Sequence, residues 1–152
     1  MNMDPALIYR QSDGQGCSPV RLVVLLYEQL IKDVQTALLA LESGNVEARV
    51  AAVNHAFEVA AELQVRLDRE RGGEVARNLE QFYQLFRVSL LEAQIKCSKA
   101  IFQNQIANLL SLREAWLEVE RSTSQAFSQP AQAPPASPAV SASASSASDW
   151  KA

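Results

Sequence analysis

Leu67-Asp-Arg-Glu-Arg-Gly-Gly-Glu-Val-Ala-Arg-Asn-Leu79 places two adjacent glycines between two long runs of apolar residues at helical spacing. Glycine adopts positive φ without Cβ strain, so Gly72 suits the left-handed position just past a helix end and Gly73 suits the start of the next helix. Glu74 then falls in the first helical turn, where the helix dipole favours negative charge. The stretch therefore predicts a reversal of the chain between two helices.

Proline and glycine also limit the folded region. Between Pro19 and Pro130 the chain contains no proline, and apart from the glycine pair its only glycine there is Gly44. Long helices meet breakers only at these positions. After residue 121 serine, alanine and proline dominate, and such a segment has too few large apolar groups to offset the entropy lost on ordering. The predicted division is residues 1–16 as a flexible segment, residues 17–121 as one folded domain and residues 122–152 as a disordered tail.

Four runs of the sequence have apolar residues at steps of three and four, which is the periodicity of helices. Ser18 before Pro19 is typical of a helix start, because the serine oxygen accepts from a free backbone amide and proline suits the first helical position. Asn45 and Ser98 are the predicted caps of the second and fourth helices. Short connections favour antiparallel neighbours, so the predicted fold is all-α, an antiparallel up-down-up-down four-helix bundle. The predicted buried stripes are Leu22, Leu26, Leu30, Val34, Ala37 and Leu41; Val46, Val50, Val53, Phe57, Ala60, Leu63 and Leu67; Val75, Leu79, Phe82, Phe86, Leu90 and Ala93; and Phe102, Ile106, Leu109, Leu112, Trp116 and Val119.

Two groups of residues fall outside these stripes. Val23 and Tyr27 lie in a run that is apolar all round, which predicts surplus apolar surface on the first helix. Ala52, Ala56 and Val59 lie beside the second stripe, where small side chains can leave a shallow groove for another helix. Alanine on an exposed helix is also simply a good helix former, so both interpretations of this second face stay open.

The charge pattern argues against several classes of function. The net charge is −3, and acidic and basic residues are interspersed, which disfavours a nucleic-acid face or a polybasic membrane surface. The most apolar run, Leu22 to Tyr27, is far shorter than the roughly 20 residues of a membrane-spanning helix. Residues 1–10 are too polar for a secretory signal. We therefore predict a cytoplasmic protein that does not insert into membranes, with free thiols at Cys17 and Cys97.

Catalytic patterns are also missing. A metal-dependent bundle commonly uses two Glu-x-x-His pairs, but the single histidine, His55, has Ala52 where its glutamate would stand. We therefore interpret His55 as a helix-surface or boundary residue. The glycine pair lies between predicted helices, whereas phosphate-binding loops follow a strand. We predict no catalytic residue, no metal and no cofactor, and a metal-dependent bundle enzyme is kept only as a remote alternative.

Three motifs, in order along the chain, resemble those of one protein family. They are Cys17-Ser-Pro-Val-Arg-Leu-Val-Val-Leu-Leu-Tyr27, then Gly72-Gly-Glu-Val-Ala-Arg-Asn-Leu79 followed by Phe82-Tyr83, and finally Leu112-Arg-Glu-Ala-Trp116. Each motif is common by itself, but three at this spacing are specific. Across residues 6–121 the chain resembles the FliS family of flagellar export chaperones.

That resemblance implies a cytoplasmic chaperone that binds the C-terminal region of flagellin, prevents premature polymerisation and delivers the subunit to the flagellar export apparatus. A disordered client segment with amphipathic character can lay its apolar face into grooves between helices. The alternative is a helical adaptor for another flagellar export substrate or regulator. The predicted client-binding residues are Val23, Tyr27, Ala52, Ala56, Val59, Asn78 and Tyr83.

A small apolar cluster near the N-terminus predicts a lid. Leu7, Ile8 and Tyr9 stand on a polar, glycine-containing tether that follows them to residue 16. A tethered segment has a high effective concentration at a nearby site. As a hypothesis, the cluster covers the empty client groove and is displaced when the client binds.

Overall fold

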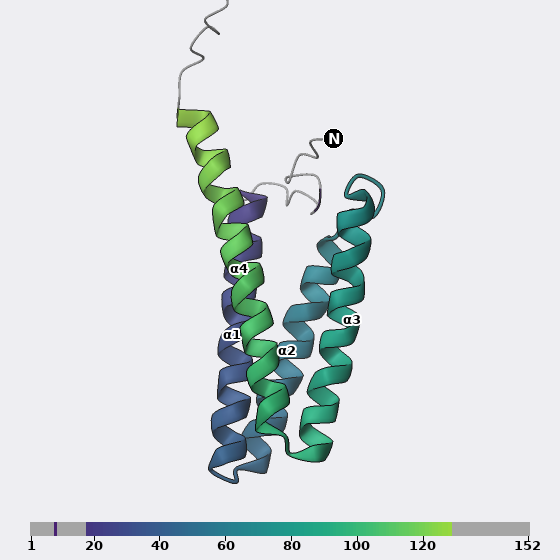
Figure 1. Ribbon diagram of the computed structural model, residues 1–152, viewed down its shortest axis with the longest axis vertical. Helices are drawn as coiled ribbons and strands as arrows, with labels where there is room; N and C mark the ends of the chain where they lie inside the picture. Colours follow the sequence, from purple (N-terminus) through teal and green to yellow (C-terminus); the bar gives the residue numbers. More distant parts are fainter. Residues whose placement is uncertain (1–7, 9–17, 129–152) are drawn as a thin grey trace, which may run out of the picture. The chain divides into compact units, whose positions relative to one another are not determined.

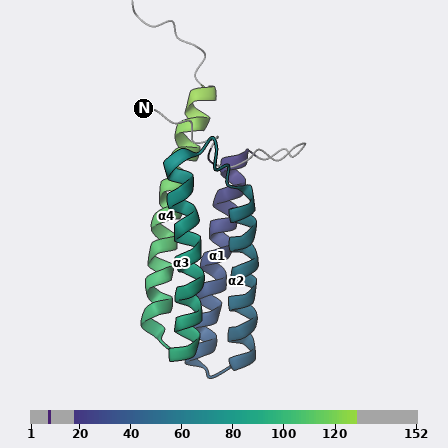
Figure 2. The same ribbon diagram turned by 90° about the vertical axis from the view of Figure 1, so that its right-hand side faces the viewer.

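The computed structural model describes Ile8 and residues 18–128, with side chains described as far as Thr123. Its helices are α1 (Pro19–Glu42), α2 (Val46–Arg66), α3 (Gly73–Lys96) and α4 (Lys99–Ser128). The chain divides into one compact unit over residues 1–121 and a second over residues 122–152. In the first unit consecutive helices run antiparallel, so the predicted all-α four-helix bundle is confirmed (Figure 1, Figure 2).

Side-chain contacts define the order of the helices around the bundle. An ion pair of 3.4 Å joins Arg21 on α1 to Glu120 on α4. On the opposite side Gln64 of α2 donates a hydrogen bond to Glu80 of α3, at 3.5 Å. Each helix therefore neighbours the helices before and after it in the chain, and α1 also neighbours α4. The remaining pairs, α1 with α3 and α2 with α4, lie diagonally across the core.

The predicted helix starts are confirmed. The side-chain oxygens of Ser18, Asn45 and Ser98 each accept a hydrogen bond from the backbone amide three residues later, at 3.1, 3.0 and 3.3 Å. These bonds satisfy amides that have no partner inside the helix. The α3–α4 connection contains the one described non-glycine residue with positive φ, Cys97 at 50°. Its thiol is free and exposed, whereas Cys17 lies outside the described residues.

Of the two glycines of the reversal, Gly73 begins α3 as predicted, but the left-handed conformation predicted for Gly72 is found at Gly73 instead. Gly73, the first residue of α3, has the positive φ of 56°, whereas Gly72 has an ordinary φ of −77°. Gly72 is instead confined by its neighbours: a Cβ atom there would lie 2.6 Å from the Asp68 carbonyl oxygen and 2.6 Å from the Ala76 Cβ. The turn is tight because α2 ends before Asp68 and the chain must fold back within a few residues.

The predicted end of the last helix is wrong. We placed a disordered tail from residue 122, but α4 continues to Ser128. The segment from Ser122 to Ser128 contains neither proline nor glycine, and the next breaker is Pro130. The residue before a proline is disfavoured in a helix, which agrees with an end at this point. The rest of the predicted tail lies outside the described residues.

The predicted core stripe of α1 is confirmed at Leu30, Val34 and Ala37, which are buried, but its first two turns are shifted by one residue. Val23 and Tyr27 are fully buried, whereas Leu22 and Leu26 are only half-buried. The prediction that Val23 and Tyr27 form surplus surface is therefore wrong. In a run that is apolar all round, periodicity does not specify which face turns inward.

The alanine-rich face of α2 is also part of the core. Ala52, Ala56 and Ala60 are buried, together with Val59. The helix pair α1 and α2 has the most extensive close approach in the bundle, with Cα atoms within 8 Å of each other. Short side chains permit such close axes. The predicted groove on this face is therefore filled by the packing of the bundle itself.

Candidate functional site

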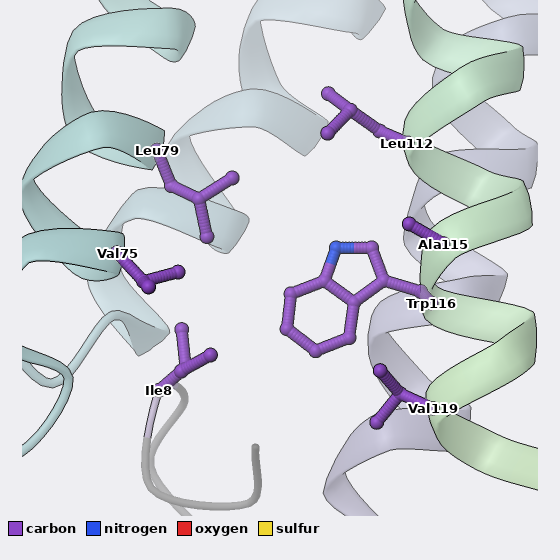
Figure 3. Close-up of a pocket in the computed structure, with 7 residues that line it drawn as sticks. All are labelled: Ile8, Val75, Leu79, Leu112, Ala115, Trp116 and Val119. Atoms are coloured by element: carbon purple, nitrogen blue, oxygen red, sulfur yellow. The ribbon is translucent and has the colours of Figure 1, made fainter. Parts of the chain in front are cut away.

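An apolar pocket of about 250 Å³ opens between α3 and α4. Figure 3 shows the Trp116 indole at its centre, with residues of α3 facing it and Ile8 at one edge. Among the described residues no charged side chain lines it, so it fits an apolar group rather than a charged or hydrogen-bonding ligand. The lining residues, which we call the α3–α4 pocket, are Ile8, Val75, Leu79, Leu112, Ala115, Trp116 and Val119.

Helical spacing brings these side chains together. Val75 and Leu79 are four residues apart on α3, and Leu112, Trp116 and Val119 follow at steps of four and three on α4. Side chains at those steps share one face of a helix. The indole is large and 6% exposed, so it fills the centre of the pocket and leaves a cleft toward α3. The predicted core position of Trp116 is confirmed.

Ile8 is held over this pocket by the reversal between α2 and α3. Its carbonyl oxygen accepts a hydrogen bond from the Asp68 amide at 2.8 Å, and its side chain is 7% exposed. A Cβ at Gly72 would lie 3.3 Å from the Ile8 Cα, so the glycine allows the close approach. Of the predicted lid residues Ile8 thus docks on the bundle. Leu7 and Tyr9 lie outside the described residues.

Six of the seven predicted client-binding residues have no accessible side chain in this conformation. Only Asn78, on α3, is exposed. Contact with a client at the other positions would need the helices to separate, and a role for them in client binding stays a prediction. The buried six are Val23, Tyr27, Ala52, Ala56, Val59 and Tyr83.

Tyr27 and Tyr83 instead form a polar contact across the core. Their hydroxyl oxygens are 2.6 Å apart and share a hydrogen bond, and both side chains are fully buried. The contact joins α1 to α3, which lie on a diagonal of the bundle. A buried hydroxyl requires a partner, so this pair fixes the relative register of the two helices.

A second polar cluster joins α1 to α2. Asp33 is the only buried charged residue in the described part of the chain. Its carboxylate accepts hydrogen bonds from Gln29 Nε2 at 2.9 Å and from His55 Nδ1 at 2.6 Å. The His55 side chain is half exposed, as a boundary residue should be. Within the described residues no group of three or more histidine, cysteine or acidic side chains could hold a metal ion.

An exposed apolar surface on α3 was missed at the level of sequence. Leu85, Val88, Leu91 and Ile95 are between 47% and 82% exposed. Their steps of three and four residues put them on the face of α3 opposite its buried residues Leu79, Tyr83 and Phe86. We call these four residues the outer α3 face. The sequence did contain a signal for this face, because these four residues form a second set of apolar residues at helical spacing beside the core stripe of α3.

None of the helices within residues 18–128 combines the length and the hydropathy needed to cross a bilayer.

Known proteins match most of the chain. A family model described as flagellar protein FliS matches residues 2–123. The flagellar secretion chaperone FliS of Campylobacter jejuni is 32% identical over 111 residues, which cover 73% of this chain and 87% of the relative.

Two further relatives have similar coverage. The flagellar secretion chaperone FliS of Salmonella typhimurium is 29% identical over 110 residues, covering 72% of this chain and 82% of the relative. The flagellar secretion chaperone FliSB of Pseudomonas aeruginosa is 28% identical over 106 residues, covering 70% and 84%. With a family match over most of its length and the four-helix bundle described above, this chain belongs to the FliS family of flagellar export chaperones.

Proposed function

We propose that this chaperone binds the C-terminal region of flagellin in the cytoplasm, prevents its premature polymerisation and delivers it to the flagellar export apparatus. It acts by binding and catalyses no reaction. Membership of the FliS family supports this function. The observation that carries it is the α3–α4 pocket, an apolar site that the protein covers with its own Ile8.

The chemistry of that pocket suits an unfolded protein segment. An amphipathic segment that is disordered before assembly exposes apolar side chains, and these lose contact with water when they enter an apolar cleft. The described residues that line the pocket contribute aliphatic side chains and one indole. Such a site discriminates weakly between apolar side chains, so the length and pattern of the client must supply the specificity.

Co-expression with the flagellin of the same organism tests the function. We expect the two proteins to copurify, and we expect the complex to be lost when the C-terminal region of flagellin is removed. A flagellin trimmed at its N-terminus by the same length is the matched control and should be retained. Absence of a complex with intact flagellin would refute the proposal, and stable capture of a different flagellar export substrate would favour the adaptor instead.

The docked Ile8 also supports the lid hypothesis. If Ile8 occupies space that the client needs, part of the client's binding free energy is spent on displacing it. Deletion of residues 2–12, or the single change Ile8→Asn, should then tighten flagellin binding several-fold. Gln11→Asn, in the same segment, is the control and should leave the dissociation constant unchanged.

Titration calorimetry measures these dissociation constants, and fluorescence reports the site directly. The chain has two tryptophans, so in a Trp150→Phe background all indole emission comes from Trp116 in the pocket. Client binding should shift this emission, and Ile8→Asn should shift it in the free protein. If removal of Ile8 leaves flagellin binding unchanged or weaker, Ile8 is not a lid.

A further inference from the structure

The reversal between α2 and α3 presents one backbone donor to another part of the chain. The amides of Glu70 and Arg71 donate to the Asp68 carboxylate at 3.2 and 3.0 Å, and the Gly72 amide donates to the Asp68 carbonyl oxygen at 2.7 Å. The Asp68 amide donates instead to the Ile8 carbonyl oxygen at 2.8 Å. Within the described residues, no other backbone hydrogen bond joins segments that are distant in the sequence.

The local sequence explains why this amide needs an acceptor from elsewhere. Leu67 leaves α2 with an extended backbone, at φ −63° and ψ 131°, so the helical hydrogen-bond pattern stops before Asp68. In a capping box, the side chain three residues further on accepts from the amide of the capping residue. That position holds Arg71, whose side chain contains only donors. The Asp68 amide is therefore satisfied by a residue that the turn does not contain.

The contacts around the Asp68 amide fit one residue of a peptide chain. The Ile8 side chain lines the edge of the α3–α4 pocket and is 7% exposed. A Cβ at Gly72 would lie 3.3 Å from the Ile8 Cα, so the glycine leaves room for a peptide backbone. The carbonyl, the Cα and the side chain of a single residue each meet a different part of this site. We call the Asp68 amide, Gly72 and the adjoining edge of the pocket the backbone site.

Displacement of Ile8 by a client removes the acceptor of the Asp68 amide. A client that covered the site with side chains alone would leave this donor without a partner, which costs binding free energy. A client that brings a main-chain carbonyl to the same place avoids that cost. The carbonyl must be free to accept, whereas in the interior of a helix it already accepts from the amide four residues later. An extended segment meets this requirement.

We propose that the Asp68 amide binds the client directly, by donating to a main-chain carbonyl of an extended client segment whose aliphatic side chain enters the α3–α4 pocket. The client thus repeats the contacts that Ile8 makes in the free protein. This inference rests on the proposed function, because it names the conformation and the side-chain class of the client segment at the same site. A main-chain contact is available at any residue except for the side chain it carries, so one aliphatic residue of the client can replace another.

Two pairs of substitutions isolate the amide, all made in full-length Ile8→Asn protein so that docking of Ile8 does not compete. Asp68→Pro removes the amide, and the extended backbone of Leu67 suits a residue before proline. Asp68→Ala keeps the amide and loses only the carboxylate, so it is the reference. Arg69→Pro and Arg69→Ala are the control pair, because the Arg69 amide has no hydrogen-bond acceptor among the described residues and follows a capping residue, where proline is tolerated.

Calorimetric titration with the C-terminal region of flagellin measures the effect of each pair. We expect Asp68→Pro to bind about tenfold more weakly than Asp68→Ala, the effect of leaving one donor without a partner in a covered site. Arg69→Pro and Arg69→Ala should bind equally well. Equal binding by the two Asp68 variants would contradict the inference.

Hydrogen exchange, followed by NMR, tests the same amide without a substitution at position 68. In the Ile8→Asn protein we expect the Asp68 amide proton to exchange rapidly, and we expect the client to protect it. This measurement decides the question by itself if Asp68→Pro does not fold. An Asp68 amide that still exchanges rapidly in the complex would overturn the inference.

The outcomes separate this inference from the proposed function. If the wild-type protein does not bind flagellin, the proposed function is refuted and the inference fails with it. If flagellin binds but neither protects the Asp68 amide nor distinguishes Asp68→Pro from Asp68→Ala, only the inference is overturned. The client would then contact the α3–α4 pocket through side chains alone.

Discussion

Position 72 requires glycine because the neighbouring atoms leave no room for a Cβ. Its φ of −77° is open to any residue, but a Cβ would meet a backbone oxygen and a side-chain carbon at 2.6 Å. Gly44 is the opposite case, with φ at +74° and no neighbour within 4 Å of a Cβ. A side chain is therefore excluded by a clash with neighbouring atoms at position 72 and by backbone strain at position 44.

We predict that Gly72→Ala and Gly44→Ala differ in kind as well as in size. Gly44→Ala should cost about 1–2 kcal/mol of unfolding free energy, the cost of a left-handed non-glycine residue. Gly72→Ala should cost about 3 kcal/mol, because crowding in a packed site typically costs 1–3 kcal/mol and the clash involves backbone. Urea unfolding gives both values.

Trp116 fluorescence provides a second comparison of Gly72→Ala and Gly44→Ala, because Ile8 lies between position 72 and the pocket of Trp116. Because the added methyl group at position 72 approaches the Ile8 Cα, Gly72→Ala should change the Trp116 fluorescence of the folded protein, and Gly44→Ala should not. An equal effect of the two substitutions on fluorescence would contradict our account of Gly72.

At the scale of single residues, the features that depend on local chemistry could be predicted. Ser18, Asn45 and Ser98 cap their helices through contacts only three residues away, and short sequence patterns specify such contacts. The positions of Val23 and Tyr27 could not be predicted, because their burial depends on which neighbouring helices cover them. The steric confinement of Gly72 could not be predicted for a related reason, since the approach of Ile8 to the turn is a tertiary contact.

At the scale of helices, the Tyr27–Tyr83 hydrogen bond connects the diagonal pair α1 and α3. The two helices of this diagonal pair meet through side chains that reach the centre of the bundle. Phe82 extends the contact, with its ring centroid 5.5 Å from that of Tyr83 in an edge-on arrangement. This aromatic group therefore connects α1 to α3 across the centre of the bundle.

We predict measurable coupling between the two tyrosines. Tyr27→Phe and Tyr83→Phe should each cost about 0.5–1.5 kcal/mol, the usual net value of a buried hydrogen bond. The double variant should cost less than the sum, because the shared hydrogen bond is lost in either single variant. Thermal or urea unfolding of the four proteins in this cycle measures the coupling, and strictly additive effects would show that the hydroxyl contact does not contribute.

The helices themselves were predictable, whereas their binding surfaces were not. Long runs without proline, interrupted at Gly44 and at the glycine pair, together with the cap residue Ser98 between α3 and α4, specify the element order. Apolar periodicity then identifies a buried stripe, but α2 and α3 each have two apolar faces. On α2 the alanine face is buried and Val46 and Val50 are exposed, while on α3 the outer face stays uncovered. Which of the two faces is buried depends on how closely the neighbouring helices approach, and a single sequence does not give that distance.

At the scale of the whole bundle, the packing is uneven. The backbones of α1 and α2 approach closely through small side chains. By contrast, α4 meets its neighbours mainly through large side chains, among them Phe102, Leu109 and Trp116. A helix held by large side chains leaves more irregular space beside it, and the α3–α4 pocket lies on this side of the bundle.

The close α1–α2 hairpin has a consequence for how the protein folds. Its contacts are local in sequence and its turn is short, so the entropy cost of forming it is low. The kinetic φ-value, a quantity distinct from the backbone angle, is the fraction of a substitution's effect on stability that is already present in the folding transition state. We predict a high value for Val53→Ala in α2 and a low value for Leu109→Ala in α4, both measured from stopped-flow folding and unfolding rates. Comparable values at the two sites would contradict a hairpin nucleus. Because the hairpin is complete at residue 66, we expect it to form on the ribosome before α4 has been synthesised.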